Sequence, residues 1–154
     1  MKVCGIDPGN SGGICVLDTN NLSTPALLDL GAVHIYEAGL WMHNQNIDII
    51  FLEDVHSLHG MSAKSNFSFG RNLGVVMTLA QVVMKGQPTN YVHPKVWQKY
   101  IGVTAKGTKN IKKNIAKIAM SLYPNADIYG KRGGFKDGKA DALMIAHYGI
   151  NHIP

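Results

Sequence analysis

The sequence predicts a single α/β domain over residues 1–154, built on a five-stranded mixed sheet with helices on its faces. Three short strand-like segments follow one another near the N-terminus and are separated only by turns. Further along, strand-like runs alternate with stretches whose apolar residues recur at helical spacing, the order of a mixed sheet flanked by helices. A chain of 154 residues that is 45% hydrophobic and 16% charged suits one folded unit with one sizeable core.

The first three predicted strands form a meander. Residues 3–7 lead into a turn with the sequence Pro-Gly-Asn-Ser-Gly-Gly, residues 14–17 return as the antiparallel partner, and residues 26–30 follow a second turn. Residues 47–53 form a near-continuous apolar run, which is the pattern of a strand buried on both faces in a parallel pairing. Residues 89–93 give a fifth strand.

Helical spacing accounts for most of the remaining chain. Residues 33–44 are expected to form a helix whose inward side chains are Val33, Tyr36 and Leu40. A second helix should end near Gly86, because an apolar stripe precedes it: Phe69, Leu73, Val76, Met77, Ala80, Val83 and Met84. A third helix carries the stripe Ile111, Ile115, Ile118, Ala119 and Leu122. A last helix from Asp137 to about Gly149 is apolar on most sides, so we expect it to be buried.

Positive charge is concentrated in the second part of the chain. Residues 1–60 hold one basic and seven acidic residues, a net charge of −6, whereas residues 61–154 hold fourteen basic and three acidic residues, a net charge of +11. This asymmetry favours a polyanionic partner together with a separate cluster of carboxylates. A solvated cationic surface that only keeps the protein soluble is the alternative.

The sequence also indicates a compartment. No apolar run approaches the roughly 18 residues needed to span a bilayer, and the N-terminus has no secretory pattern. A cytoplasmic location is therefore expected. Cys4 and Cys15 are too few for a disulfide framework or for a zinc site on their own, so we expect both to be small apolar residues.

Three carboxylates fall where an unpaired charge is costly. Asp7 and Glu53 each end an apolar strand, and Asp141 lies one turn inside the most apolar helix. Because the two strands are expected to be parallel neighbours, both of their acids should emerge at one edge of the sheet. Carboxylate oxygens suit hard divalent cations, and two such ions about 4 Å apart can activate a water and stabilise the leaving oxygen in phosphodiester hydrolysis.

Each acid also has a simpler interpretation. Asp7 can be the first residue of an Asp-Pro-Gly turn. Glu53 can be the solvated end of its strand, with Asp54 as the ligand instead, although strand parity puts Asp54 on the opposite face. Asp141 can pair with a lysine. The presence of all three acids on these elements favours the metal site.

Several ordered motifs resemble those of the RuvC-type Holliday junction resolvases. They are Gly-Ile-Asp-Pro-Gly at residues 5–9, Leu-Glu-Asp-Val at residues 52–55 and Ala-Asp-Ala-Leu at residues 140–143. The segments 69–74 and 94–96 resemble the family as well, so the similarity covers nearly the whole chain. In its details the sequence is most similar to the short RuvC-like proteins of bacteriophages.

The resemblance implies a ribonuclease H-like fold and a magnesium-dependent endonuclease that resolves Holliday junctions and other branched DNA in recombination and repair. It implies paired nicks that leave 5′-phosphate and 3′-hydroxyl ends, made by a homodimer on a four-way junction. Two Mg²⁺ ions per active site are implied, with Mn²⁺ as a substitute, in the cytoplasm of a bacterial or phage-infected cell.

The resemblance also assigns the ligands. Asp7, Glu53 and Asp141 match the family's catalytic, metal-binding carboxylates. The family's fourth ligand lies three residues before the last aspartate, which is Gly138 here, so the chain departs from the pattern. Asp137 lies on the same helical face as Asp141, and it either replaces the fourth ligand or only caps the helix.

Basic and aromatic residues are candidates for DNA contact. The loop of residues 56–67 is rich in small and polar residues and could reach the junction centre, where Phe67 or Phe69 would stack on an unpaired base; Phe69 also fits the core stripe of its helix. Phosphate contacts are expected from a group of cations, each of which taken singly could be plain surface: Lys64, Arg71, Lys106, Lys109, Lys113, Lys131 and Arg132. One lysine among Lys109, Lys112 and Lys113 is further expected to face the metals and stabilise transition-state charge.

Three other functions fit parts of the sequence. An actin- or hexokinase-like ATPase also has Asp-x-Gly before a glycine-rich hairpin, but it needs a second lobe and a second phosphate loop. A related ribonuclease H-like nuclease that processes structured RNA would share the fold. A non-enzymatic junction-binding protein would tolerate the loss of the ligand at Gly138.

Overall fold

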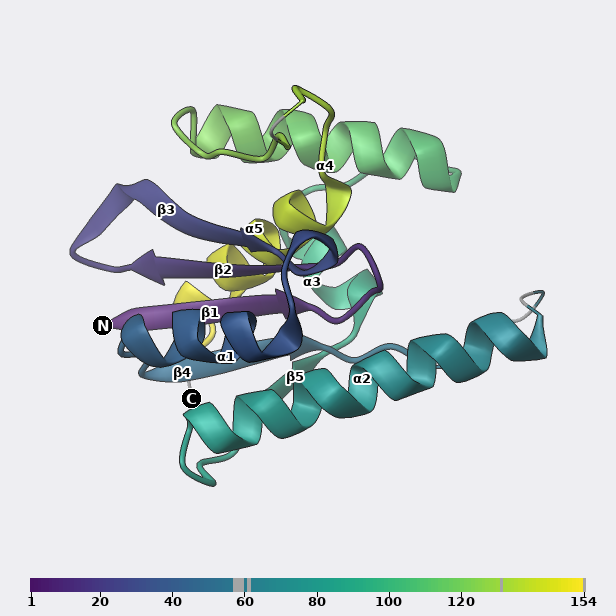
Figure 1. The fold of residues 1–154 in the computed structure, drawn as a ribbon. Coiled ribbons are helices and arrows are strands. Elements are labelled where there is room, and N and C mark those ends of the chain that lie inside the picture. Colours follow the sequence, from purple (N-terminus) through teal and green to yellow (C-terminus); the bar gives the residue numbers. More distant parts are fainter. Residues whose placement is uncertain (57–59, 61, 131, 154) are drawn as a thin grey trace.

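The computed structural model describes every residue of the chain except 57–59, 61, 131 and 154. Figure 1 shows the predicted meander of three strands followed by alternating helices and strands. In chain order the elements are β1 (Lys2–Asp7), β2 (Gly13–Asp18), β3 (Asn21–Asp29), the 3-10 helix η1 (Leu30–Ala32), α1 (Ile35–Asn44), β4 (Ile49–Glu53), α2 (Ala63–Val83), β5 (Asn90–Val92), α3 (Pro94–Tyr100), α4 (Thr108–Leu122) and α5 (Asp137–Ile150).

The strands form one mixed sheet in the order β3-β2-β1-β4-β5. The β1–β2 and β2–β3 pairs are antiparallel, whereas the β1–β4 and β4–β5 pairs are parallel. Ile6 lies beside Leu52 in the β1–β4 register, so the last residues of these strands, Asp7 and Glu53, end at the same edge. The predicted five-stranded mixed sheet and the parallel pairing of its two acid-bearing strands are confirmed.

Helices cover both faces of the sheet (Figure 1). Buried residues of α3, α4 and α5 form one core cluster with the sheet, and those of α1 and α2 form another on the opposite face. Cys15 belongs to the first cluster and Cys4 to the second, and both are buried free thiols. The prediction that both are small apolar residues is confirmed. Among the described residues, no helix has the length and apolarity that crossing a membrane requires.

Three details of the predicted elements are wrong. In α1 the buried residues are Ala38 and Met42, whereas Tyr36 and Leu40 are 66% and 48% exposed. This helix has a second apolar stripe, and that stripe is the one the sheet leaves uncovered. β3 begins at Asn21, five residues before its predicted start. The short helix α3 was not predicted, because seven residues are too few to show a helical period.

Candidate active site

Asp7 and Glu53 lie together because β1 and β4 are parallel neighbours. Val3 and Phe51 pack in the core on the α5 side of the sheet, and the alternation of side chains along each strand puts Asp7 and Glu53 on that same face. Both acids are partly buried. Asp7 Oδ1 accepts a 3.0 Å hydrogen bond from the backbone N–H of Gly9, which ties the carboxylate to the turn after β1.

Asp141 reaches the same edge because α5 packs directly on the backbone of β1. A Cβ at Gly5 would lie 2.3 Å from the carbonyl oxygen of Ala142, so only glycine permits this approach. Within the described part of the chain, Asp141 Oδ1 is buried and has no hydrogen-bond partner. A buried carboxylate oxygen without a partner is costly, and it is the kind of atom that a ligand site leaves open.

The three carboxylates influence one another's ionisation. Burial is the largest cause in each case: it raises the pKa of Asp7 to about 6 and that of Glu53 to about 7, and it holds the pKa of Asp141 well above its usual range. Repulsion by Asp7 further raises the pKa of both other acids, and repulsion by Glu53 adds to the shift of Asp141. The structure therefore brings acids from three separate elements into one electrostatic cluster.

The carboxylates of the cluster are not arranged around a common metal position in this structure. No three Asp, Glu, His or Cys side chains among the residues described are arranged to hold a metal ion. Glu53 Oε1 instead accepts a 2.9 Å hydrogen bond from Trp97 Nε1. The donor types and the open oxygen of Asp141 fit a divalent cation. Trp97 was not a predicted site residue, since its position depends on α3.

Asp137 joins the cluster from the first turn of α5. The N-cap residue of this helix is Lys136, without a side-chain cap bond, so the interpretation of Asp137 as a plain cap is wrong. Its carboxylate forms an ion pair with Lys112 of α4. Repulsion by Asp137 contributes to the raised pKa values of Asp7 and Asp141, so it lies within electrostatic reach of both.

Gly138 is explained by close packing. Gly138 forms an isolated β-bridge with Gly12 in the turn before β2. A Cβ at Gly138 would lie 2.2 Å from the carbonyl oxygen of Ser11 and 2.6 Å from the carbonyl carbon of Gly12. Backbone atoms on both sides cannot move away as a flexible side chain would. A ligand side chain is therefore excluded at the position where the resemblance places one, and Asp137 is the acid that the start of the helix offers.

Lys112 is the lysine of α4 that faces the acids. Its pKa is raised, first by the hydrogen bond to Asp137 and then by the negative charges of Asp137, Asp141 and Asp7. The sequence left the choice open because Lys109, Lys112 and Lys113 lie within about one turn of a single helix. All three lysines are exposed and line one cavity with Tyr129 and Phe135, but only Lys112, among these three, pairs with an acid of the cluster.

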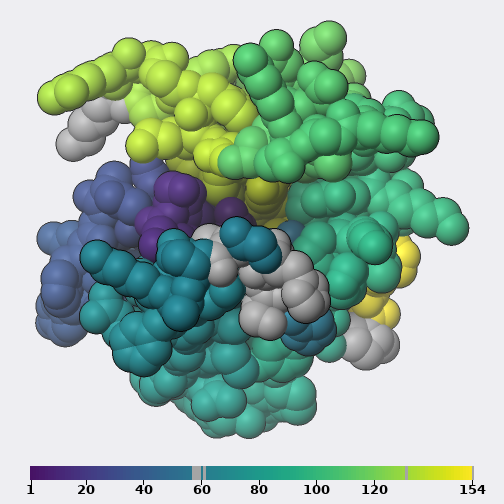
Figure 2. Space-filling model, turned by 90° about the vertical axis from the view of Figure 1, so that its right-hand side faces the viewer, coloured from purple at the N-terminus to yellow at the C-terminus, as the bar shows by residue number. Residues whose placement is uncertain are grey.

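Predicted DNA-contact residues lie on two sides of the acids. On the α2 side, Lys64 and Arg71 each line a cavity that also includes Asn10 of the turn after β1, and Phe67 is 76% exposed. On the other side, the exposed residues are Lys106, Lys109, Lys113 and Arg132. Figure 2 shows the purple turn after β1 recessed between the teal of α2 and the green of the α4 region. Lys131 and residues 57–59 and 61 of the predicted loop lie outside the described residues.

No protein-family model matches the chain, and no curated protein matches it. Solved structures do. RuvC of Thermus thermophilus in complex with a Holliday junction substrate is 19% identical over 95% of this chain and 90% of that chain, with a TM-score of 0.58. A second structure of Thermus thermophilus RuvC is also 19% identical, over 95% and 91% of the two chains, with a TM-score of 0.55. Fowlpox virus resolvase, solved with Holliday junction DNA, is 17% identical over 96% and 93%, and its TM-score of 0.48 is too low to carry weight.

The chain has a ribonuclease H-like fold. This confirms the predicted fold class, and the correspondence with RuvC spans nearly the whole length of both chains. At 19% identity the likeness concerns the fold alone.

Proposed function

We propose that the protein is a metal-dependent endonuclease that resolves four-way DNA junctions and other branched DNA. The observation that carries this proposal is the cluster of partly buried carboxylates from β1, β4 and α5, in which Asp141 keeps a buried oxygen without a partner among the described residues. The choice of substrate is supported by the motifs of the sequence and by a fold shared with RuvC, which was solved on a Holliday junction. Membership of the bacteriophage branch stays a prediction.

Asp7, Glu53 and Asp141 would hold two Mg²⁺ ions, for which Mn²⁺ can substitute, and Asp137 would serve as the fourth acid. Such cations supply an activated water and stabilise the leaving oxygen of a phosphodiester, giving 5′-phosphate and 3′-hydroxyl ends. Lys112 holds Asp137 in its ion pair and places a positive charge beside the acids, where negative charge grows on the scissile phosphate.

The basic residues on both sides of the acids would bind the DNA backbone. Lys64 and Arg71 approach from α2, and Lys106, Lys109, Lys113 and Arg132 from the side of α4, so a junction arm lying between them would pass over the carboxylates. The exposed ring of Phe67 would stack on an unpaired base. Because phosphate contacts release counterions, binding should weaken steeply as salt increases.

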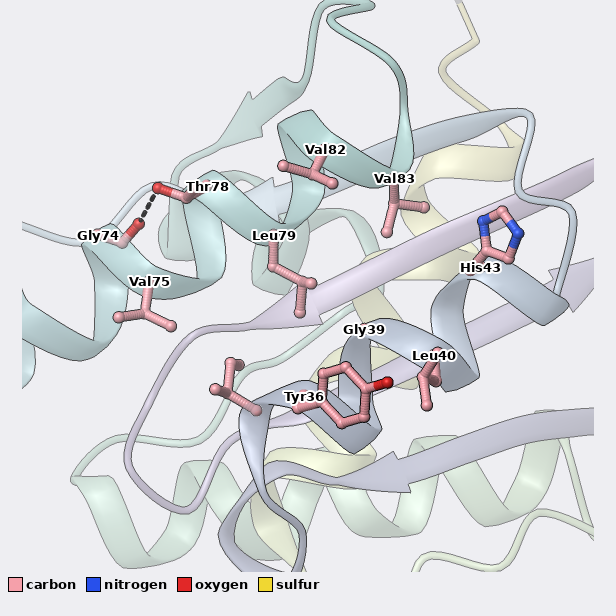
Figure 3. A pocket seen from close by; sticks show the side chains of 11 residues that line it. Tyr36, Gly39, Leu40, His43, Gly74, Val75, Thr78, Leu79, Val82 and Val83 are labelled. Atoms are coloured by element: carbon pink, nitrogen blue, oxygen red, sulfur yellow. Dashed lines mark hydrogen bonds between the residues drawn. The ribbon is translucent and has the colours of Figure 1, made fainter.

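Paired nicking of a junction requires two active sites, which we propose a homodimer provides. An apolar groove of about 670 Å³ lies between α1 and α2, and Figure 3 shows side chains of both helices facing it. Its described lining residues include no lysine, arginine or carboxylate. The hydroxyl of Thr78 is satisfied by the carbonyl of Gly74 within α2, at 2.9 Å. An exposed groove of this kind is a typical contact surface, and a two-fold axis would pair it with the same groove of a second copy.

The substrate proposal is tested with labelled four-way DNA, linear duplex DNA and structured RNA, each incubated with Mg²⁺ or with a chelator. Junction-selective, Mg²⁺-dependent nicking is the expected result. Junction binding without cutting in either condition would identify a junction-binding protein instead. Cleavage confined to RNA would identify a processing ribonuclease of the same fold.

A further inference from the structure

Trp97 places its only polar atom on a carboxylate of the candidate active site. The side chain is fully buried and packs in the core between the sheet and α5. Its Nε1 donates a 2.9 Å hydrogen bond to Oε1 of Glu53. An indole N–H is only a donor, so this bond engages one oxygen of Glu53 and leaves the other, Oε2, available.

Chain connectivity explains why this tryptophan lies over the end of β4. In the parallel pairing of β4 with β5, Glu53 lies beside Val92. The next residue, His93, is the N-cap of α3. Its Nδ1 accepts a 3.2 Å hydrogen bond from the backbone N–H of Lys95. Trp97 then falls one turn into the helix. The distance along the chain from the strand end to the ring is therefore short, and the core around the ring leaves little room for movement.

We propose that Trp97 is a positioning residue that fixes the Glu53 carboxylate for cation binding, an inference that rests on the proposed function. By engaging Oε1, the indole restricts the side-chain torsions of Glu53 and leaves Oε2 as the oxygen that would bind the cation. Hydrogen-bond partners of metal-ligating groups orient those groups, and their loss typically weakens metal affinity or activity by about 10–100-fold.

A purely structural role would have a different signature. A buried indole N–H needs an acceptor in any case, and Glu53 would then be only a convenient one. Loss of the N–H would in that case lower the thermal midpoint without changing metal affinity. The two roles are separated by measuring both quantities on the same variants.

The probe is Mn²⁺ alone, bound to the full chain in the absence of DNA and followed by calorimetry and by electron paramagnetic resonance of the free ion. Trp41 and Trp97 are the two tryptophans of the chain, and Trp41 packs against the core on the opposite face of the sheet. Trp41→Phe is therefore a matched control that also leaves Trp97 as the single tryptophan. In that background, Trp97 is replaced by Phe and, separately, by benzothienylalanine, which keeps the bicyclic shape but has sulfur in place of the N–H.

We expect Mn²⁺ affinity to fall by about tenfold or more in both Trp97 replacements and to be unchanged in Trp41→Phe. Saturating Mn²⁺ should change the emission of Trp97 in the Trp41→Phe protein. The proposal is overturned if the folded benzothienylalanine protein binds Mn²⁺ as tightly as its Trp97 parent, even if its thermal midpoint falls. Absence of Mn²⁺ binding by the wild-type chain would overturn the proposed function as well, which distinguishes the two failures.

Discussion

α5 and α2 cover opposite faces of the same sheet and differ in what they bury. α5 buries nine of its fourteen residues, and this most buried helix carries Asp137 and Asp141 at its start. α2 buries only two of its twenty-one residues, and it leaves Val82 69% exposed beside the groove shared with α1. The α5 face of the sheet therefore holds partly buried carboxylates, whereas the α2 face leaves apolar side chains exposed to solvent.

Both features work against the stability of an isolated chain. Partly buried carboxylates that repel one another are unfavourable unless a cation joins them, and an apolar groove is unfavourable in water unless a partner covers it. The two regions should therefore respond in opposite ways to the same kind of change. Neutralising an acid should stabilise the fold and abolish cutting, whereas adding a charge to the groove should leave the acids intact and separate the subunits.

The largest effect is expected from the acids. Asp7→Asn and Glu53→Gln should each lower junction nicking by about a thousandfold or more, because the loss of metal-assisted charge stabilisation is worth several kcal/mol. Both variants should still bind junction DNA, since the phosphate contacts come from other residues. Nicking rates and gel retardation on the same junction measure the two properties.

Asp54→Asn is the matched control for Glu53→Gln. Asp54 follows the end of β4 and is partly exposed, and its Oδ2 lies 3.8 Å from Nε2 of His56. Loss of the Asp54 charge should therefore leave the nicking rate within a few-fold of wild type. Normal cutting by Asp7→Asn, or loss of cutting in Asp54→Asn alone, would show that the metal ligands are misassigned.

On the opposite face, Val82→Glu should separate the proposed dimer. A carboxylate in the centre of an apolar contact must lose its hydration without a partner, a cost of several kcal/mol per contact, so we expect dimer affinity to fall by a hundredfold or more. Analytical ultracentrifugation measures the dimer affinity. The two nicks in one junction should then be made independently of each other. Val96→Glu is the control: it changes another exposed valine, 48% exposed on α3 and outside the groove, and should leave the mass of the dimer in solution unchanged. A monomeric wild-type protein, with or without junction DNA, would refute the groove as a dimer contact.

Gly138→Ala tests whether the departure from the RuvC motif is a packing requirement. Overpacking against the backbone of Ser11 and Gly12 should lower the free energy of unfolding by about 1–3 kcal/mol, measured by chemical denaturation. Gly134→Ala is the control, because no atom of the described residues lies within 4 Å of a Cβ there. If Gly138→Ala is as stable as wild type, the absence of a ligand at this position needs another explanation.

The sequence predicted the sheet and the adjacency of Asp7 and Glu53 because a continuous apolar run indicates a buried parallel strand, and parallel strands end at a common edge. It also placed Asp141 on a buried helix. It did not show that Glu53 would bond to Trp97, since the bond depends on a helix too short to have a visible period. Patterns that extend over many residues were readable, whereas single contacts made across the fold were not.

The same limit explains the error in α1. Ala38 and Met42 form one apolar stripe and Tyr36 and Leu40 form another, and spacing alone does not show which of them meets the sheet. Lys112 was likewise indistinguishable from its two neighbours until the start of α5 was placed next to α4. In both cases the missing information was the rotation of a helix about its axis.

The smallest effect concerns the pH dependence of stability without metal. Asp7 and Glu53 have folded-state pKa values of about 6 and about 7, above their ordinary values. The folded chain therefore holds protons that the unfolded chain has already released, so their contribution to the free energy of unfolding decreases as pH rises from about 4 to about 7. The lowered pKa of partly buried His147 acts in the opposite direction, which is why the variant must be compared with wild type at each pH. With a chelator present, Asp7→Asn should exceed the thermal midpoint of wild type by more at pH 8 than at pH 5. Mg²⁺ should then stabilise wild type more than the variant. Equal midpoint differences at both pH values would contradict the raised pKa of Asp7, which burial causes first.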